Sequence, residues 1–114
     1  MTKHDPKLDV LFSALSDPTR RTVLERLCRG PASVGELAAP HDMALPSFLG
    51  HLRKLEAAGL VTSDKKGRVR TVRLVPGALQ TAHGWLTRQN ADWPGRMERL
   101  DSFVSLMKRG KDSA

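Results

Sequence analysis

The sequence lacks the features that mark several protein classes. Its single cysteine, Cys28, excludes a disulfide within the chain and suits a reducing compartment, so we expect a cytoplasmic protein. No apolar run approaches the about 20 residues that span a bilayer, and the first residues, MTKHDPKLD, lack the apolar core of a secretory leader. The sequence also offers no nucleophile–base pair, paired carboxylates, phosphate-binding glycine loop or cluster of metal ligands, which argues against an enzyme and against a cofactor.

Positive charge is abundant and unevenly placed. The formal net charge is +7 and the pI is near 10.3. Residues 45–75 hold seven Lys or Arg against two acids, Glu56 and Asp64, which is +5 of the +7. This concentration predicts a surface for a polyanionic partner. At 114 residues the chain predicts a single domain, residues 1–114, with loose ends at 1–6 and 110–114.

The most informative stretch runs from residue 45 to residue 74. Its first part, LPSFLGHLRKLEAAGL, places Phe48, Leu52 and Leu55 at helical spacing, and Gly59 ends the predicted helix as a C′ glycine does. Two alternating runs follow, 60–63 and 69–74, on either side of a predicted turn at 64–67. With a short helix before it, this order predicts a winged helix-turn-helix, which puts one helix in the major groove of double-stranded DNA and a basic hairpin on the backbone.

Capping residues and periodicity predict the other helices. We expect helices over 7–15, 18–29 and 34–39, the second started by Asp17 and Pro18 and the third by a capping box of Ser33 and Glu36. Residues 40–43 form the predicted turn. The inward side of the second helix is predicted to hold Val23, Leu24, Leu27 and Cys28. A helical segment from about residue 78, split at Pro94, completes a mainly α fold with a small β-hairpin, in the order α-α-α-α-β-β-α(α).

The predicted DNA-facing residues of the 45–58 helix are Leu45, Pro46, Ser47, Leu49, Gly50, His51, Arg53 and Lys54. Leucine side chains can touch thymine methyl groups, glycine permits a close backbone approach, and Ser47 and His51 are the polar candidates for base edges. Two alternatives stay open. Leu49 could be a core residue, and His51 could cap the helix or pack locally.

The predicted hairpin supplies a second set of DNA-binding residues: Lys65, Lys66, Arg68 and Arg70. Arg68 is the candidate for a minor groove, and the others suit phosphates, which fix affinity and register. The alternative is a solvated polar face. Arg20 and Arg21 suit either the DNA backbone or a plain helix surface.

The outer helices, 7–15 and 78–108, carry more apolar surface than one small domain can cover. We therefore expect a homodimer. Its predicted interface comprises Leu8, Leu11, Phe12, Leu86, Trp93, Leu100, Val104 and Met107. The alternative is that these helices only complete the core of a monomer.

Four segments resemble, in order and spacing, the ArsR-type winged-helix repressors: ALSDPTRR at 14–21, SVGEL at 33–37, HLRKLEAAGLV at 51–61 and GRVRT at 67–71. The resemblance covers about residues 8–108. It implies a homodimeric bacterial transcriptional regulator that binds DNA, with a dimer interface formed by the first and last helices. Many members repress their own operon.

The chain departs from the metal-sensing members of that family. Their cysteine pair in the first helix of the helix-turn-helix has no counterpart in VGELA at 34–38, and His83 has no second histidine beside it in either terminal helix. A zinc site needs about four converging ligands, so no metal site is predicted. The positions of Leu45, Pro46, Leu49 and Gly50, which are often polar in relatives, are apolar or bare here.

Two functions therefore compete on the sequence alone. The first is a sequence-specific DNA-binding regulator, most simply a repressor on a pseudo-palindromic operator. The alternative is a winged-helix protein-interaction module without DNA binding, which should have an uncharged hairpin, whereas this one is basic. A small-molecule effector is compatible with the sequence but not indicated by it, and Cys28 is expected to be a small buried residue.

Overall fold

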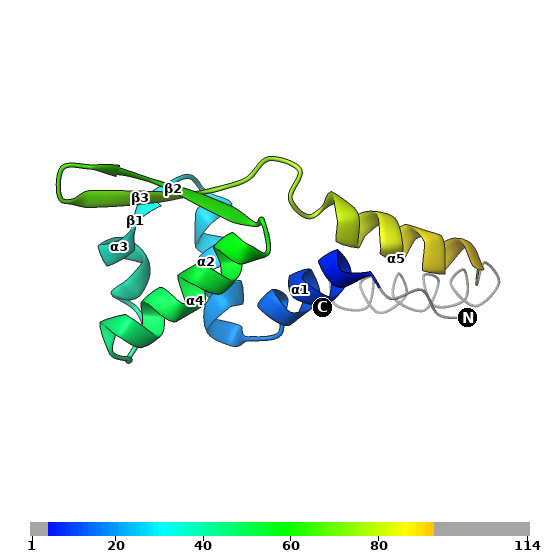
Figure 1. Cartoon of the computed structure of the whole chain (residues 1–114), viewed down its shortest axis with the longest axis horizontal. Coiled ribbons are helices and arrows are strands. Elements are labelled where there is room, and N and C mark those ends of the chain that lie inside the picture. Colours follow the sequence, from blue (N-terminus) through cyan, green and yellow to red (C-terminus); the bar gives the residue numbers. More distant parts are fainter. Residues whose placement is uncertain (1–4, 93–114) are drawn as a thin grey trace, which may run out of the picture. The chain divides into compact units, whose positions relative to one another are not determined.

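The computed structural model describes residues 5–92 of the chain. Its elements are α1 (Pro6–Leu15), α2 (Pro18–Leu27), β1 (Ala32–Ser33), α3 (Val34–Ala38), α4 (Leu45–Ala57), β2 (Val61–Lys66), β3 (Val69–Leu74) and α5 (Gln80–Asp92) (Figure 1). The chain divides into two units after Ala82, so that the first unit holds every element from α1 to β3 and the second holds most of α5. The predicted helix break at Pro94 and the last predicted helix lie outside the described residues.

Helices α2 and α3 begin at the predicted capping residues, and Asp17 accepts from the amides of Thr19 (2.8 Å) and Arg20 (3.2 Å) ahead of α2. Helix α1 begins one residue before its predicted start, where Asp5 accepts from the Lys7 amide at 3.0 Å. The predicted capping box of α3 is present, with the Ser33 and Glu36 side chains each accepting from the other residue's amide. These bonds satisfy amides that have no partner within the helix.

The sheet has three antiparallel strands in the order β1-β3-β2. Strand β1 was not predicted, because two residues are too short to show an alternating pattern. It pairs Ala32 with Val72 and Ser33 with Thr71. The segment just before α3 is therefore hydrogen-bonded to the hairpin.

The predicted four-residue turn at 64–67 was wrong. Strand β2 continues through Lys66, which pairs with Val69, so only Gly67 and Arg68 connect the strands. Gly67 has a φ of 60° and no other residue type has a positive φ within the described range, which matches a type II′ hairpin with glycine at its first central position. Polar residues at 64–66 indicated a turn, but they are the solvated continuation of a strand.

The core of the first unit lies where these helices meet the base of the hairpin. Its most deeply buried side chains are Phe48 and Leu55 of α4, Val23 of α2, Leu60, and Val72 of β3. The predicted inward positions Val23, Leu24 and Leu27 are confirmed, but Cys28 is exposed. It follows the last residue of α2, which ends two residues earlier than predicted, before Gly30 (φ 137°) turns the chain toward β1.

Within residues 5–92, no helix is both long enough and apolar enough to cross a bilayer.

Candidate nucleic-acid interface

One face of helix α4 is apolar and packs in the core, and the opposite face is exposed to solvent. Phe48, Leu52 and Leu55 are at most 5% exposed. The outward positions are Leu45, Pro46, Ser47, Arg53 and Lys54, all exposed. Because the buried stripe fixes the rotation of α4 about its axis, the exposed residues keep a defined orientation.

Three predicted DNA-facing residues of α4 are only half-exposed. Leu49 packs partly against the core, so its side chain divides between core and surface. Gly50 is half-buried, and a Cβ added there would meet only the end of the Arg53 side chain, at 3.8 Å. His51 is half-buried as well and has local partners, as the open alternative for this residue anticipated.

His51 belongs to a polar cluster with Arg20 and Asp17. The Nδ1 atom of His51 lies 2.9 Å from Nη1 of Arg20 and 3.8 Å from Oδ1 of Asp17. Arg20 is only 5% exposed, and its guanidinium also donates to the carbonyls of Ala14 (2.8 Å) and Ser13 (3.1 Å). The end of α1, the start of α2 and the middle of α4 therefore meet at one side chain.

Neither role predicted for Arg20 was correct. Arg20 is too buried, at 5% exposed, to serve as a backbone contact or a helix-surface residue, and it instead links three helices. Arg21 is exposed, and its guanidinium donates to the Leu15 carbonyl at 2.7 Å. The sequence signal that could have indicated this role is Pro18, which has no amide to donate to the Ala14 carbonyl four residues earlier.

The pKa of Asp17 is lowered by this surrounding. Burial alone would raise its pKa, but the backbone hydrogen bond from Arg20, the nearby His51 ring, the Thr19 amide and the Arg20 charge together outweigh burial and favour the carboxylate. The cap of α2 is therefore ionised under ordinary conditions.

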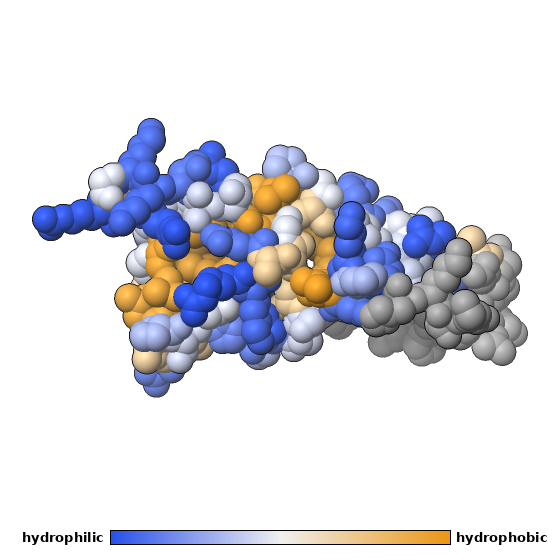
Figure 2. All heavy atoms as spheres, in the orientation of Figure 1, coloured by the Kyte–Doolittle hydropathy of each residue, from blue (hydrophilic) through white to orange (hydrophobic). Residues whose placement is uncertain are grey.

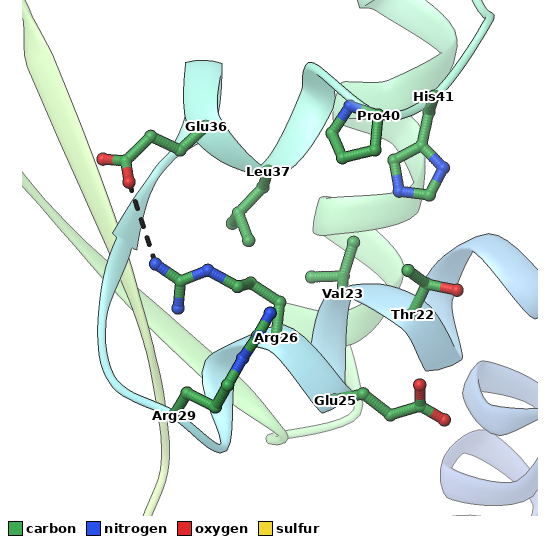
Figure 3. A pocket seen from close by; sticks show the side chains of 9 residues that line it. All are labelled: Thr22, Val23, Glu25, Arg26, Arg29, Glu36, Leu37, Pro40 and His41. Atoms are coloured by element: carbon green, nitrogen blue, oxygen red, sulfur yellow. Dashed lines mark ion pairs between the residues drawn. The ribbon is translucent and has the colours of Figure 1, made fainter.

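A second charged side chain holds α3, the first helix of the helix-turn-helix, against α2. Arg26 lies 3.7 Å from Glu36 and donates to the Gly30 carbonyl at 3.1 Å. Figure 3 shows this ion pair at the edge of a hollow between α2 and α3, with Leu37 and Pro40 on the α3 side. A helix of five residues is too short to be stable alone, so these contacts and its capping box help to hold it in place.

The β2–β3 hairpin forms a strongly cationic wing. Lys65, Lys66, Arg68 and Arg70 are all exposed, and Figure 2 shows hydrophilic side chains gathered over the hairpin. Lys65 lies directly opposite Arg70 in the register. Both continue the strand face on which Val61 and Val72 are buried nearer the core, because side chains two residues apart share a face.

The acid of the hairpin does not neutralise these four residues. Asp64 pairs with Arg73 at 3.1 Å, which leaves Lys65, Lys66, Arg68 and Arg70 without an ion-pair partner among residues 5–92. Glu56 of α4 accepts a hydrogen bond from the Ser63 hydroxyl (2.9 Å), so the acid at the end of α4 connects the helix to the wing.

The described residues contain no group of three or more His, Cys, Asp or Glu side chains placed to hold a metal ion. In this part of the chain His83 is exposed on α5, and His41 stacks against Phe48 with ring centroids 5.6 Å apart.

A short helix, a turn, an amphipathic helix and a cationic β-hairpin define the class of this protein: it is a winged helix-turn-helix protein. Comparison with known proteins identifies the family within this class. A family profile described as a helix-turn-helix domain matches residues 15–64.

Two regulators and two solved structures illustrate the similarity. The chain is 41% identical over 71 residues to the HTH-type transcriptional regulator Rv2034 of Mycobacterium tuberculosis, across 62% of this chain and 66% of that protein. It is 33% identical over 76 residues to the transcriptional repressor SdpR of Bacillus subtilis, across 67% of this chain and 84% of SdpR. The crystal structure of the ArsR family transcriptional regulator RHA00566 is 46% identical, with a TM-score of 0.77 over 83% of this chain and 98% of that one. An ArsR-like regulator from Rhodococcus sp. RHA1 is 33% identical, with a TM-score of 0.67 over 85% of this chain and 92% of that one.

The chain belongs to the ArsR family of winged helix-turn-helix transcriptional regulators. The family resemblance and the mainly α winged fold predicted from the sequence are confirmed. This is a family of regulators and not of enzymes, as the sequence indicated.

Proposed function

We propose that this protein binds a pseudo-palindromic operator as a homodimer and represses transcription there, with α4 in the major groove and the wing on the neighbouring backbone. The observation that carries this proposal is the Lys65–Arg70 pair, two cations held opposite each other on a hairpin. Repression is supported by the similarity to SdpR, which is named a transcriptional repressor. A protein that acts on a bacterial chromosome works in the cytoplasm.

The cations of the wing repel one another unless an anion binds to them. Like charges directly opposite on neighbouring strands destabilise the pairing, and Lys66 and Arg68 add two more exposed cations within three residues of the pair. A row of phosphates removes this repulsion and releases counterions from the DNA, which stabilises the complex. The exposed Arg53 and Lys54 place further positive charge on α4.

The proposed dimer rests on apolar side chains that the outer helices expose. Val10 is 44% exposed and Leu86 49%. Phe12 stays a predicted interface residue. Leu8 is half-buried, while Leu11 is 4% exposed within one chain and needs no partner to be covered. Val10 was not among the predicted interface residues and replaces Leu11 in the proposal. Trp93, Leu100, Val104 and Met107 lie outside the described residues and stay predictions.

A DNA-binding assay with matched charge variants tests the proposal. DNA that the wild-type protein enriches from a random pool and from genomic fragments serves as the operator. Lys66→Ala should weaken binding to operator and scrambled DNA alike and reduce the salt slope by about one unit per lost phosphate contact, or about two in a symmetric dimer.

The control is Arg29→Ala, which removes the same charge from an exposed residue just after α2, outside the proposed surface. It should leave affinity and slope nearly unchanged. Equal effects of Lys66→Ala and Arg29→Ala would mean that only net charge matters and would refute the assignment of the wing. Sedimentation of the wild type at micromolar concentration should give about twice 12.6 kDa, and a monomer that binds the operator tightly would refute the dimer.

A further inference from the structure

The tautomer of His51 can be derived from its contact with Arg20. A guanidinium has five N–H donors and no acceptor. The 2.9 Å approach of Arg20 Nη1 to His51 Nδ1 is therefore a hydrogen bond only if Nδ1 carries no proton. A proton on Nδ1 would bring two donors together.

The competing partner of the same nitrogen is weaker. Asp17 Oδ1 lies 3.8 Å from His51 Nδ1, beyond the range of a hydrogen bond, and it already accepts from the amides of Thr19 and Arg20. The Arg20 contact therefore decides the tautomer: when the His51 ring carries a single proton, that proton is on Nε2.

The Nε2 atom of His51 is accessible. No buried side-chain nitrogen or oxygen among the described residues lacks a hydrogen-bond partner. Because the structure gives Nε2 no partner, this atom reaches solvent. Ser47 and Lys54, four residues before and three after, lie on the same side of α4 and are exposed.

We propose that Arg20 is a positioning residue for DNA recognition, which fixes the tautomer of His51 so that the recognition helix presents an N–H donor to the DNA. The target is a hydrogen-bond acceptor: N7 of a purine, O6 of guanine, O4 of thymine or a phosphate oxygen. Amino groups of adenine and cytosine are excluded, because they are donors. This inference rests on the proposed function, in which α4 enters the major groove.

The tautomer is tested first, without DNA. Long-range 1H–15N correlation spectra at pH 8, where an ordinary imidazole is neutral, distinguish the two ring nitrogens of His51. We expect a protonated Nε2 and a bare Nδ1. A protonated Nδ1, alone or with Nε2, would overturn the inference whether or not the protein binds DNA.

The contact is tested with His51→Asn, whose amide oxygen takes the place of Nδ1 and still accepts from Arg20, while the Nε2 donor is lost. Operators carrying single 7-deazapurine substitutions report a base acceptor at N7, those with 4-thiothymine report O4 and those with 6-thioguanine report O6. Methylphosphonates report a phosphate acceptor. We expect one position at which the substitution weakens wild-type binding about tenfold, for two symmetry-related hydrogen bonds, but leaves His51→Asn binding unchanged.

If both proteins respond equally at every position, His51 donates to no acceptor and the inference is wrong. Arg20→Met tests the positioning step: it should lose the same single-position response although Arg20 is too buried to touch DNA. Its combination with His51→Asn should then be no worse than Arg20→Met alone. If Arg20→Met does not fold, His51→Asn and the spectra still decide the question. A failure of the wild type to bind any DNA would instead refute the proposed function and leave the tautomer result standing.

Discussion

Replacing Arg20 with Met should destabilise the protein severely, because among the described residues no other side chain donates to the Ala14 carbonyl or to Nδ1 of His51. Arg20 is 5% exposed, and its guanidinium donates at 2.8 Å to the Ala14 carbonyl, 3.1 Å to the Ser13 carbonyl and 2.9 Å to Nδ1 of His51. Methionine fills much of the volume but leaves two carbonyls and one ring nitrogen without this donor.

The size of the effect follows from these contacts. Hydrogen bonds to a charged group contribute about 1.5–3 kcal/mol each, but removing a buried charge also removes its desolvation cost. Water can reach the half-buried His51 ring and replace part of one bond. We therefore expect a loss of about 2–4 kcal/mol in the free energy of unfolding.

Urea unfolding followed by circular dichroism, at one fixed protein concentration, measures this loss. With a slope of about 1.5 kcal/mol/M the midpoint should fall by about 1–3 M. Arg21→Met is the matched control, because this neighbouring arginine is exposed and makes one bond, to Leu15. It should cost less than about 1 kcal/mol. Equal midpoints for the two variants would refute the conclusion that Arg20 links α1, α2 and α4.

Three further predictions concern pH, the wing and metals. Asp17 has a lowered pKa, so its contribution to stability should be complete above its ordinary value of 3.8 and disappear as the pH falls through the lower pKa of the folded state. In Asp17→Asn the free energy of unfolding should depend less on pH in that window than it does in the wild type. Equal pH dependence in the two proteins would contradict this prediction. Lys65→Glu places an opposite charge across from Arg70, so the protein should gain up to about 1 kcal/mol of stability, measured as a slightly higher thermal midpoint. DNA titrations should find weaker binding, and an unchanged DNA affinity would argue against the wing contact. Zinc, arsenite or a chelator should leave operator affinity nearly unchanged, and a tenfold shift that vanishes in His83→Ala or Cys28→Ala would overturn the prediction of metal indifference.

Local signals in the sequence were sufficient for the helices that form the site. The rotation of α4 follows from the spacing of Phe48, Leu52 and Leu55, and the starts of α2 and α3 follow from Asp17 and Ser33. Each of these signals depends on neighbours within one or two turns. The cationic nature of the wing was equally accessible, because it depends only on composition.

Contacts between residues far apart in the sequence could not be predicted from such local signals. Arg20 and His51 are 31 positions apart, and a charged residue near a helix start is ordinarily exposed, so its burial could not be derived from local pattern. Strand β1 exists only because β3 offers it a partner. The exposure of Cys28 depends on where α2 stops, and helix ends are the least certain feature of a periodic pattern.

The two-residue connection at Gly67 and Arg68 makes the length of the hairpin more important than the identity of its cations. Inserting or deleting one residue between Lys65 and Arg70 would shift the pairing and turn one strand's side chains to the opposite face. Lysine and arginine at positions 65, 66 and 70 can be exchanged with little effect on phosphate contacts, whereas a single-residue change in length would redirect the whole set of charges. Among related regulators, we therefore expect these three positions to vary freely between the two basic residues, and insertions to occur in multiples that preserve the alternation of the strands.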